Sequence, residues 1–185
     1  MKNNRIKKMT GVAILTSVLV VLALISNYVT IGTVNINLAL IPIVIGACVY
    51  GPLAGLFLGA VDGVMILLAP STMLFLSYNV FVTVLLCILK TGIGGLLSGY
   101  VYQLLKRKNE YLGVILSSIV LPITNTAIFL IGVFCYFMPV YLNLAPEGSN
   151  IVSFIITSTL TINFLIELIV NIALSSTIYR IIRIN

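Results

Sequence analysis

The sequence predicts an all-α integral membrane protein: a bundle of six transmembrane helices in one domain, residues 1–185. Of the 185 residues, 61% are hydrophobic and only 8% are charged, and the mean hydropathy is +1.23. A water-soluble domain would carry about 25% charged residues. The apolar runs are long and continuous, whereas the strands of a transmembrane barrel alternate apolar and polar residues. At about 20 residues per span, the chain accommodates six helices.

Turn signals divide the apolar runs into six expected helices. The first run follows a basic segment but is longer than a signal-peptide core and has no A-x-A cleavage site after it, so we predict a retained helix. Gly51-Pro52 predicts a tight return, Pro122 a kink, and the polar segment Ser26–Asn37 an extracytoplasmic loop. The expected helices cover residues 9–25, 38–50, 53–69, 78–105, 111–138 and 151–182.

The basic residues predict the orientation. They gather in residues 2–8, 106–108 and 180–183, and Lys90 lies apart from them. With a cytoplasmic N-terminus, six spans place all these clusters on the cytoplasmic side, as the positive-inside rule requires. Both termini are therefore predicted to be cytoplasmic. The net charge of +6 indicates topology and attraction to anionic headgroups of the lipid bilayer, with no nucleic-acid partner.

The composition also argues against an enzyme. Without histidine the chain cannot form a Ser-His or Cys-His nucleophile or an HExxH zinc site, and no GxxxxGK[ST] phosphate loop is present. Cys48, Cys87 and Cys135 lie apart without the spacing of metal ligands. We expect no catalytic residues, no metal site and no cofactor.

Small residues mark two helix faces for close packing. Gly51, Gly55, Gly59 and Gly63 recur every fourth residue, which aligns them on one face of the third helix. The small pair on the first helix, Ala13 and Ser17, has the same spacing. Such faces let another helix approach its backbone closely. The neighbour is either a helix of this bundle or another subunit, and the pattern leaves both open.

Polar residues at membrane depth predict a pocket between the last three helices. Asp62, Lys90, Asn125 and Glu167 each lie about ten or more residues from a helix end, near the bilayer midplane. Four-residue spacing on the sixth helix (Thr159, Asn163, Glu167, Asn171, Ser175) predicts a polar stripe facing inward. The candidate ligand-binding residues are Asn79, Thr83, Lys90, Asn125, Asn163, Glu167 and Asn171. Lys90 either neutralises Glu167 or Asp62, or is the counter-ion of an anionic ligand.

These features resemble the substrate-binding S components of energy-coupling factor (ECF) vitamin transporters. The resemblance rests on Ala13-xxx-Ser17, the long first loop, the run from Ile41 through Gly55 and the glycine face. It implies a vitamin ligand held by the last three helices with the outer loops, in the plasma membrane of a bacterium. It also implies that the first three helices dock on a transmembrane coupling subunit served by two ATPase subunits. Ala13, Ser17, Gly51, Gly55 and Gly59 would be the docking positions, with Ser17 replacing the second alanine of the family's AxxxA motif.

Two other functions stay open at this point, and so does the substrate. A self-sufficient proton-coupled transporter would use Asp62, Lys90 and Glu167 as a relay, although internal repeats are not evident. A membrane scaffold without a small ligand would leave the polar stripe unexplained. Lys90 favours a carboxylate-bearing vitamin, with pantothenate first, while folate, biotin, niacin, riboflavin or a non-vitamin substrate remain alternatives.

Overall fold

The computed structural model describes the backbone of all residues except 1, 29, 32–33, 36, 147, 149, 161–162 and 185. Side chains are described outside 1–4, 28–36, 147, 149, 158–163 and 183–185. The described chain is an α-helical bundle with one short antiparallel hairpin, which confirms the all-α membrane class. Its elements are α1 (Lys2–Tyr28), β1 (Thr30–Ile31), β2 (Val34–Asn35), α2 (Leu40–Tyr50), α3 (Pro52–Ile66), a 3₁₀ turn (Pro70–Thr72), α4 (Met73–Tyr78), α5 (Val80–Leu105), α6 (Glu110–Gly132), a π segment (Val133–Phe137), α7 (Met138–Leu144), α8 (Ile151–Leu160) and α9 (Asn163–Ile184).

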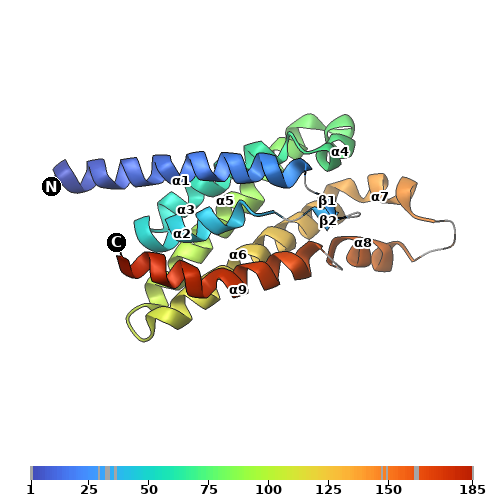
Figure 1. The fold of residues 1–185 in the computed structure, drawn as a ribbon. Coiled ribbons are helices and arrows are strands. Elements are labelled where there is room, and N and C mark those ends of the chain that lie inside the picture. Colours follow the sequence, from blue (N-terminus) through green and yellow to red (C-terminus); the bar gives the residue numbers. More distant parts are fainter. Residues whose placement is uncertain are drawn as a thin grey trace.

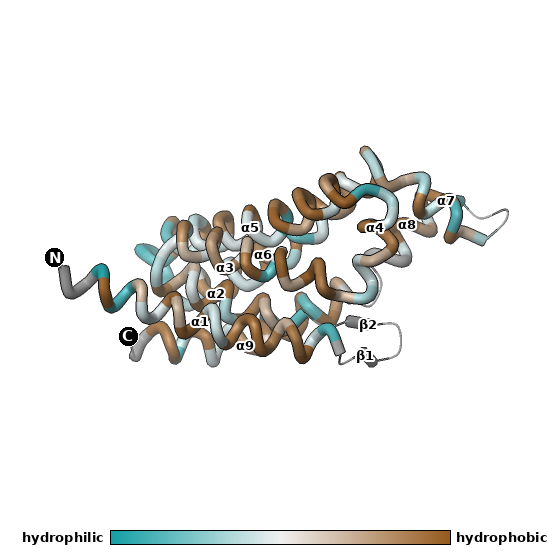
Figure 2. The backbone as a smooth tube through the Cα atoms, turned by 90° about the horizontal axis from the view of Figure 1, so that it is seen from above, coloured by the Kyte–Doolittle hydropathy of each residue, from teal (hydrophilic) through white to brown (hydrophobic). Residues whose placement is uncertain are grey.

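The long helices lie side by side, and both ends of the chain lie at the same end of the bundle (Figure 1). The turn between α5 and α6 lies at this end too, so the basic clusters predicted to share one side of the membrane are together in space. The opposite end of the bundle holds α4, the hairpin, α7 and α8 (Figure 1). Apolar residues run along the helices between the two ends (Figure 2).

The described chain contains four helices long and apolar enough to cross a membrane, at residues 5–27, 80–105, 110–144 and 164–182. A fifth candidate is the pair Pro52–Ile66 and Pro70–Tyr78, whose two parts are bent by 78°. The helix α2 has only 11 residues, about 16 Å of helix against a hydrocarbon core of about 30 Å. The count of six spans stays a prediction.

Three expected helices have different bounds. The first continues through Ser26 and Asn27, which the sequence had placed in a loop. The fourth begins only at Val80, because Asn79 is extended and its side chain accepts the backbone N–H of Val82 as an N-cap. The sixth ends at Ile184 and contains α8 and α9, and residues 161–162 between them lie outside the described residues. The side chains of Thr159 and Asn163, which belong to the predicted stripe, also lie outside the described residues.

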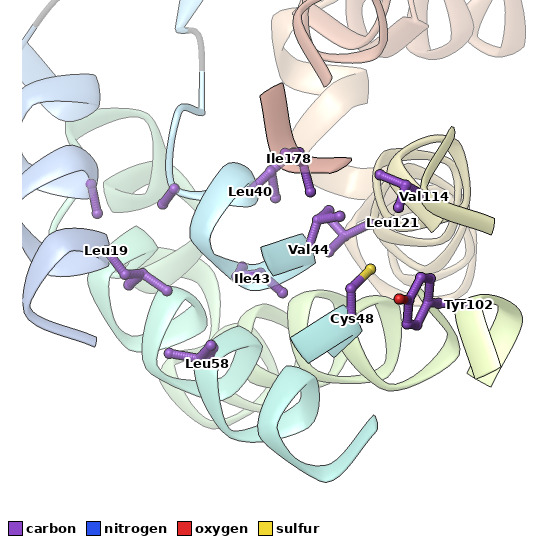
Figure 3. Packing of buried hydrophobic residues seen from close by; sticks show 12 residues of the cluster. Leu19, Leu40, Ile43, Val44, Cys48, Leu58, Tyr102, Val114, Leu121 and Ile178 are labelled. Carbon is purple, nitrogen blue, oxygen red and sulfur yellow. The ribbon is translucent and has the colours of Figure 1, made fainter. Parts of the chain in front are cut away.

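The helix α2 is central in the apolar core. Its side chains Leu40, Ile43 and Val44 are fully buried. Figure 3 shows them between Leu19 of α1, Leu58 of α3, Ile178 of α9 and the side chains of α5 and α6. A helix surrounded by protein on all sides needs no lipid-facing surface. Accordingly, α2 carries apolar residues on all of its faces, which is typical of buried helices.

The helices α3 and α5 touch backbone to backbone along their glycines. A Cβ at Gly55 would meet the carbonyl group of Gly95, and one at Gly59 would meet the carbonyl group of Thr91. The same holds for Gly63 against Cys87. Thr91 Oγ1 also donates a hydrogen bond of 2.6 Å to the Gly59 carbonyl oxygen. The glycine face is therefore a contact inside the bundle, the first of the two interpretations that the sequence left open.

A pair of serines joins α5 to α6 on the other side. Ser117 Oγ lies 2.6 Å from the carbonyl oxygen of Ser98, and Ser98 Oγ lies 3.0 Å from the carbonyl oxygen of Ser117. Both side chains are fully buried. Because water is absent at this depth, the two hydroxyl groups find their partners in the facing helix. The helix α5 is therefore held from both sides.

The α3–α5 contact predicts a large effect of one methyl group. We expect Gly59→Ala to destabilise the protein by about 1–3 kcal/mol, because the new Cβ overlaps the backbone of Thr91 and forces the helices apart. Gly92→Ala is the matched control on the same interface, since its Cβ would meet the flexible side chain of Leu56 at 3.3 Å. Thermal unfolding in lipid nanodiscs measures both. Equal melting temperatures for the two variants would contradict the backbone contact.

Candidate binding site

A cavity of about 340 Å³ lies among α1, α3, α5, α6 and α9, toward the end of the bundle with α4 and α7. Every long helix contributes to it, and so does the segment before α2. Its lining combines charged, amide, hydroxyl and aromatic side chains. The lining residues are Ser26, Asn27, Asn37, Ile66, Ala69, Pro70, Ser71, Thr72, Phe75, Thr83, Leu86, Cys87, Lys90, Asn125, Thr126, Phe129, Phe137, Tyr141, Phe164 and Glu167.

Lys90 brings a positive charge to the cavity. It lies ten residues into α5, about 15 Å from the start of the helix at Val80. Its Nζ lies 5.0 Å from the centroid of the Phe129 ring on α6, a cation–π distance that offsets part of the cost of desolvation. Within the described part of the chain no carboxylate forms an ion pair with it. The ammonium group therefore faces the cavity without a direct anionic partner.

Two carboxylates share the electrostatic environment of Lys90. Glu167 of α9 lines the same cavity as Lys90. Asp62 of α3 is fully buried, and its Oδ2 accepts a hydrogen bond of 3.2 Å from Asn37 Nδ2. Its Oδ1 has no hydrogen-bond partner among the described residues. The segment before α2 thus supplies a donor to one of the two carboxylates.

Asn125 and Thr83 are further polar groups on the cavity wall. Asn125 is 8% exposed, and its buried Oδ1 has no hydrogen-bond partner among the described residues. Thr83 Oγ1 donates to the carbonyl oxygen of Asn79 one turn earlier, at 2.7 Å. A buried amide without a partner costs free energy unless a ligand or water satisfies it. Asn125 is therefore available for a ligand, whereas the Thr83 hydrogen is already used.

An aromatic cluster forms another part of the wall. The ring of Phe75 on α4 lies 5.1 Å from Phe137, 5.8 Å from Phe129 and 6.2 Å from Tyr141, measured between centroids. The first two contacts are edge-to-face, which is a favourable geometry. Phe137 and Tyr141 reach the cavity because the π segment shifts the register of the helix ahead of Pro139. The cavity therefore has a rigid apolar side facing its charged side.

The structure brings together four of the seven predicted ligand residues: Thr83, Lys90, Asn125 and Glu167 line one cavity. Asn79 lies elsewhere, at the N-cap of α5, with its Nδ2 bonded to the Tyr136 hydroxyl at 2.7 Å. Asn171 is buried one turn beyond Glu167 and donates to the Glu167 carbonyl oxygen at 2.8 Å. The side chain of Asn163 lies outside the described residues.

The residues predicted to dock on a partner fall into three groups. Gly55 and Gly59 are buried against α5, so they cannot at the same time present a flat outer face. Gly51 is half-buried and forms the return between α2 and α3 with φ of 97°, a conformation that other residues rarely adopt. Ala13 and Ser17 lie exposed on the outer face of α1. Of the five positions, these two are the most exposed.

Sequence reasoning named no site residue in the first half of the chain. Ser26, Asn27 and Asn37 line the cavity, although the polar residues had assigned the pocket to the last three helices and only the family resemblance implied a part for the outer loops. Asn27 Nδ2 lies 3.4 Å from the carbonyl oxygen of Met65, and Ser26 Oγ accepts the N–H of Leu38. Their signal in the sequence was present, because all three belong to the polar segment Ser26–Asn37.

The fold and the cavity define a multi-pass membrane protein with a charged, aromatic-lined cavity at one end of its bundle. The chain belongs to the family of ECF transporter substrate-specific components, whose family model matches residues 7–179. Members of this family are transport subunits, not enzymes, and they associate with the membrane and ATPase subunits of the transporter and with a small-molecule substrate. No match was found among curated proteins or among solved structures.

The hydrogen bond between Asn37 and Asp62 generates a prediction. We expect Asn37→Leu to lower stability by about 1–3 kcal/mol, because it leaves the fully buried Asp62 side chain without this donor. Adding Asp62→Asn should recover part of the loss, since a neutral amide is cheaper to bury. Asn27→Leu removes a longer bond of 3.4 Å and serves as the control. Thermal unfolding in nanodiscs measures the stability of each variant. An equal loss of stability in Asn37→Leu and Asn27→Leu would contradict the pairing of Asn37 with Asp62.

Proposed function

We propose that this protein is the high-affinity substrate-binding subunit of an ATP-driven ECF-type uptake system for a carboxylate-bearing vitamin such as pantothenate. One observation carries the proposal: Lys90 and Glu167 reach the same cavity from α5 and α9 without forming an ion pair among the described residues. A charge in a membrane protein costs about 2.5–3.5 kcal/mol at the centre of a helix. Two opposite charges that are kept apart at this depth favour a ligand placed between them.

The ligand carboxylate is proposed to bind at Lys90. The ammonium group already lies over the Phe129 ring, so its position is defined before the ligand arrives. A carboxylate on its open side would form a charge-assisted hydrogen bond in a site with little water. The aromatic cluster around Phe75 would cover the apolar middle of the ligand.

The other end of the ligand is proposed to donate hydrogen bonds. Glu167 and the Oδ1 of Asn125 are both acceptors, and the Asn125 oxygen has no partner among the described residues. Hydroxyl or N–H groups of a vitamin would satisfy them. A ligand with one anionic end and one donor end therefore fits this wall better than one that carries only negative charge. Pantothenate has this form, with a carboxylate at one end and two hydroxyl groups at the other.

Coupling to transport is proposed to use the outer face of α1. Ala13 and Ser17 lie exposed one turn apart, and the Ser17 hydroxyl is bonded to the carbonyl oxygen of Ala13 at 3.2 Å. The hydroxyl is thereby satisfied within its own helix, so the face is small and effectively apolar. We propose this face as the docking site for the transmembrane coupling subunit, with two ATPase subunits hydrolysing ATP.

The role of Lys90 can be tested by titration calorimetry with pantothenate on the purified protein. We expect Lys90→Met to weaken binding by roughly 2–5 kcal/mol, the cost of removing one member of a buried charge pair. Lys90→Arg should restore little of the affinity for pantothenate, because a planar guanidinium does not occupy the place of a compact ammonium group. Pantothenol, which lacks the carboxylate, should bind wild type and Lys90→Met with similarly low affinity.

A double variant separates this role from simple neutralisation of charge. If Lys90 only balances Glu167, Lys90→Met with Glu167→Gln would regain both stability and wild-type affinity for pantothenate. Binding that stays weak in a stably folded double variant supports the counter-ion role. Retained affinity there would refute it.

Docking through α1 predicts a loss of transport without a loss of binding. We expect Ser17→Leu to reduce ATP-driven uptake at least tenfold in proteoliposomes that contain the coupling and ATPase subunits, because the larger side chain prevents close approach of the partner helix. Ligand affinity of the isolated variant should remain unchanged, since Ser17 does not line the cavity. Val18→Phe, which is exposed on α1 but lies about 100° around the helix from Ser17, is the control for added bulk. Normal uptake by Ser17→Leu would exclude this docking face.

A further inference from the structure

A second hollow lies on the outside of the bundle, between α1 and α3. It is an open groove of about 660 Å³, separate from the internal cavity. Apolar side chains and one threonine form its floor and walls, and two basic residues lie at one end. The lining residues are Arg5, Lys8, Met9, Val12, Ala13, Thr16, Leu53, Ala54 and Phe57.

The length of the groove matches half of a bilayer. Arg5 and Thr16 are 11 residues apart on one helix, which corresponds to about 16 Å at 1.5 Å per residue. The hydrocarbon core of a membrane is about 30 Å thick, so one leaflet contributes about 15 Å. An acyl chain from one leaflet would therefore fit along the groove, with its headgroup beside Arg5 and Lys8.

The charge at the end of the groove is positive and unbalanced. Arg5 and Lys8 are exposed, and neither forms an ion pair within the described part of the chain. The helix α1 contains no acidic residue at all. The groove is therefore complementary to an anionic group attached to an apolar chain.

The start of α3 adds to this positive potential. Leu53 and Ala54 line the groove and belong to the first turn of α3, which begins at Pro52. The N-terminus of a helix carries the positive end of its dipole and favours nearby anions. Because α3 has 15 residues, its dipole is well developed and points its positive end toward the same rim as Arg5 and Lys8.

We propose that this groove binds one anionic phospholipid, with the phosphate at Arg5 and Lys8 and an acyl chain along Val12, Ala13 and Phe57. A lipid fits these features better than a protein helix does. The side chains of Leu53 and Phe57, 72% and 52% exposed, border the open groove. The basic residues at the rim suit the phosphate of an anionic lipid, and the length of the groove matches an acyl chain of one leaflet.

Native mass spectrometry of the full chain tests the proposal with two probes that share their acyl chains, phosphatidylglycerol and phosphatidylcholine. We expect one tightly retained phosphatidylglycerol and a preference over phosphatidylcholine of roughly tenfold or more, because each basic residue near the surface adds to the attraction. Arg5→Gln with Lys8→Gln should abolish the preference. Lys7→Gln with Lys108→Gln removes the same charge from exposed residues outside the groove and should keep it.

A third variant tests the groove itself. Ala13→Phe leaves both charges in place but fills the channel, so it should also lose the retained lipid. Equal retention of the two lipids by wild type would overturn the proposal and leave the groove to a protein partner. An equal loss of the preference for phosphatidylglycerol in the two charge variants would overturn the proposal as well. The lipid would then be attracted by the whole basic surface and not by Arg5 and Lys8 in particular. Full retention by Ala13→Phe would show that the chain does not lie in the groove.

Discussion

The contact between the glycine faces of α3 and α5 is the constraint on which the rest of the structure depends. Between helices in lipid there is little hydrophobic driving force, so association relies on close packing and hydrogen bonds. Gly55, Gly59 and Gly63 allow carbonyl groups of α5 to touch the backbone of α3. The hydrogen bond from Thr91 to the Gly59 carbonyl oxygen adds direction to the packing. Such a contact admits one register, because a shift along either helix brings side chains into the gap.

That register positions the charged part of the cavity. Gly63 contacts Cys87 and Gly59 contacts Thr91, so the glycine contact holds Asp62 and Lys90 within about one helical turn of each other in depth. Asn37 then approaches from the segment before α2 and donates to Asp62 at 3.2 Å. Removing one partner of a buried polar pair is costly, since the other stays desolvated. Packing and charge are therefore coupled: the fold gives Asp62 one hydrogen-bond donor, Asn37, and leaves Lys90 facing the cavity.

Features that depend on local composition, such as polar residues at membrane depth, could be predicted from the sequence. Features that depend on contacts between distant parts of the chain could not. Membrane depth grouped Lys90, Asn125 and Glu167, and the three line one cavity, because a polar residue in the middle of an apolar helix must face inward. Asn79 was predicted to bind the ligand together with Lys90, but it is the N-cap of α5, and helical spacing does not apply to a cap. The glycine face was recognised, yet four-residue spacing carries no information about which helix occupies it.

The contribution of the first half of the chain could not be read from periodicity. Ser26 and Asn27 end α1, and Asn37 precedes α2, so all three look like residues of a polar connection. Only the tertiary structure turns them toward the cavity, where Ser26 accepts the N–H of Leu38. The π segment before Pro139 is another such case, since proline predicts a local irregularity but not the direction in which Phe137 points.

The proposed lipid groove and the proposed docking face share part of α1. Ala13 lines the groove and Ser17 lies one turn further along the same helix. A partner helix that packs closely on both residues must remove an acyl chain from the groove. The coupling subunit would then replace a bound lipid when it docks. Because the lipid has to leave, the net affinity for the coupling subunit is lower than the contact alone would give. A surface of this kind suits a reversible association, because lipid refills the groove when the partner leaves.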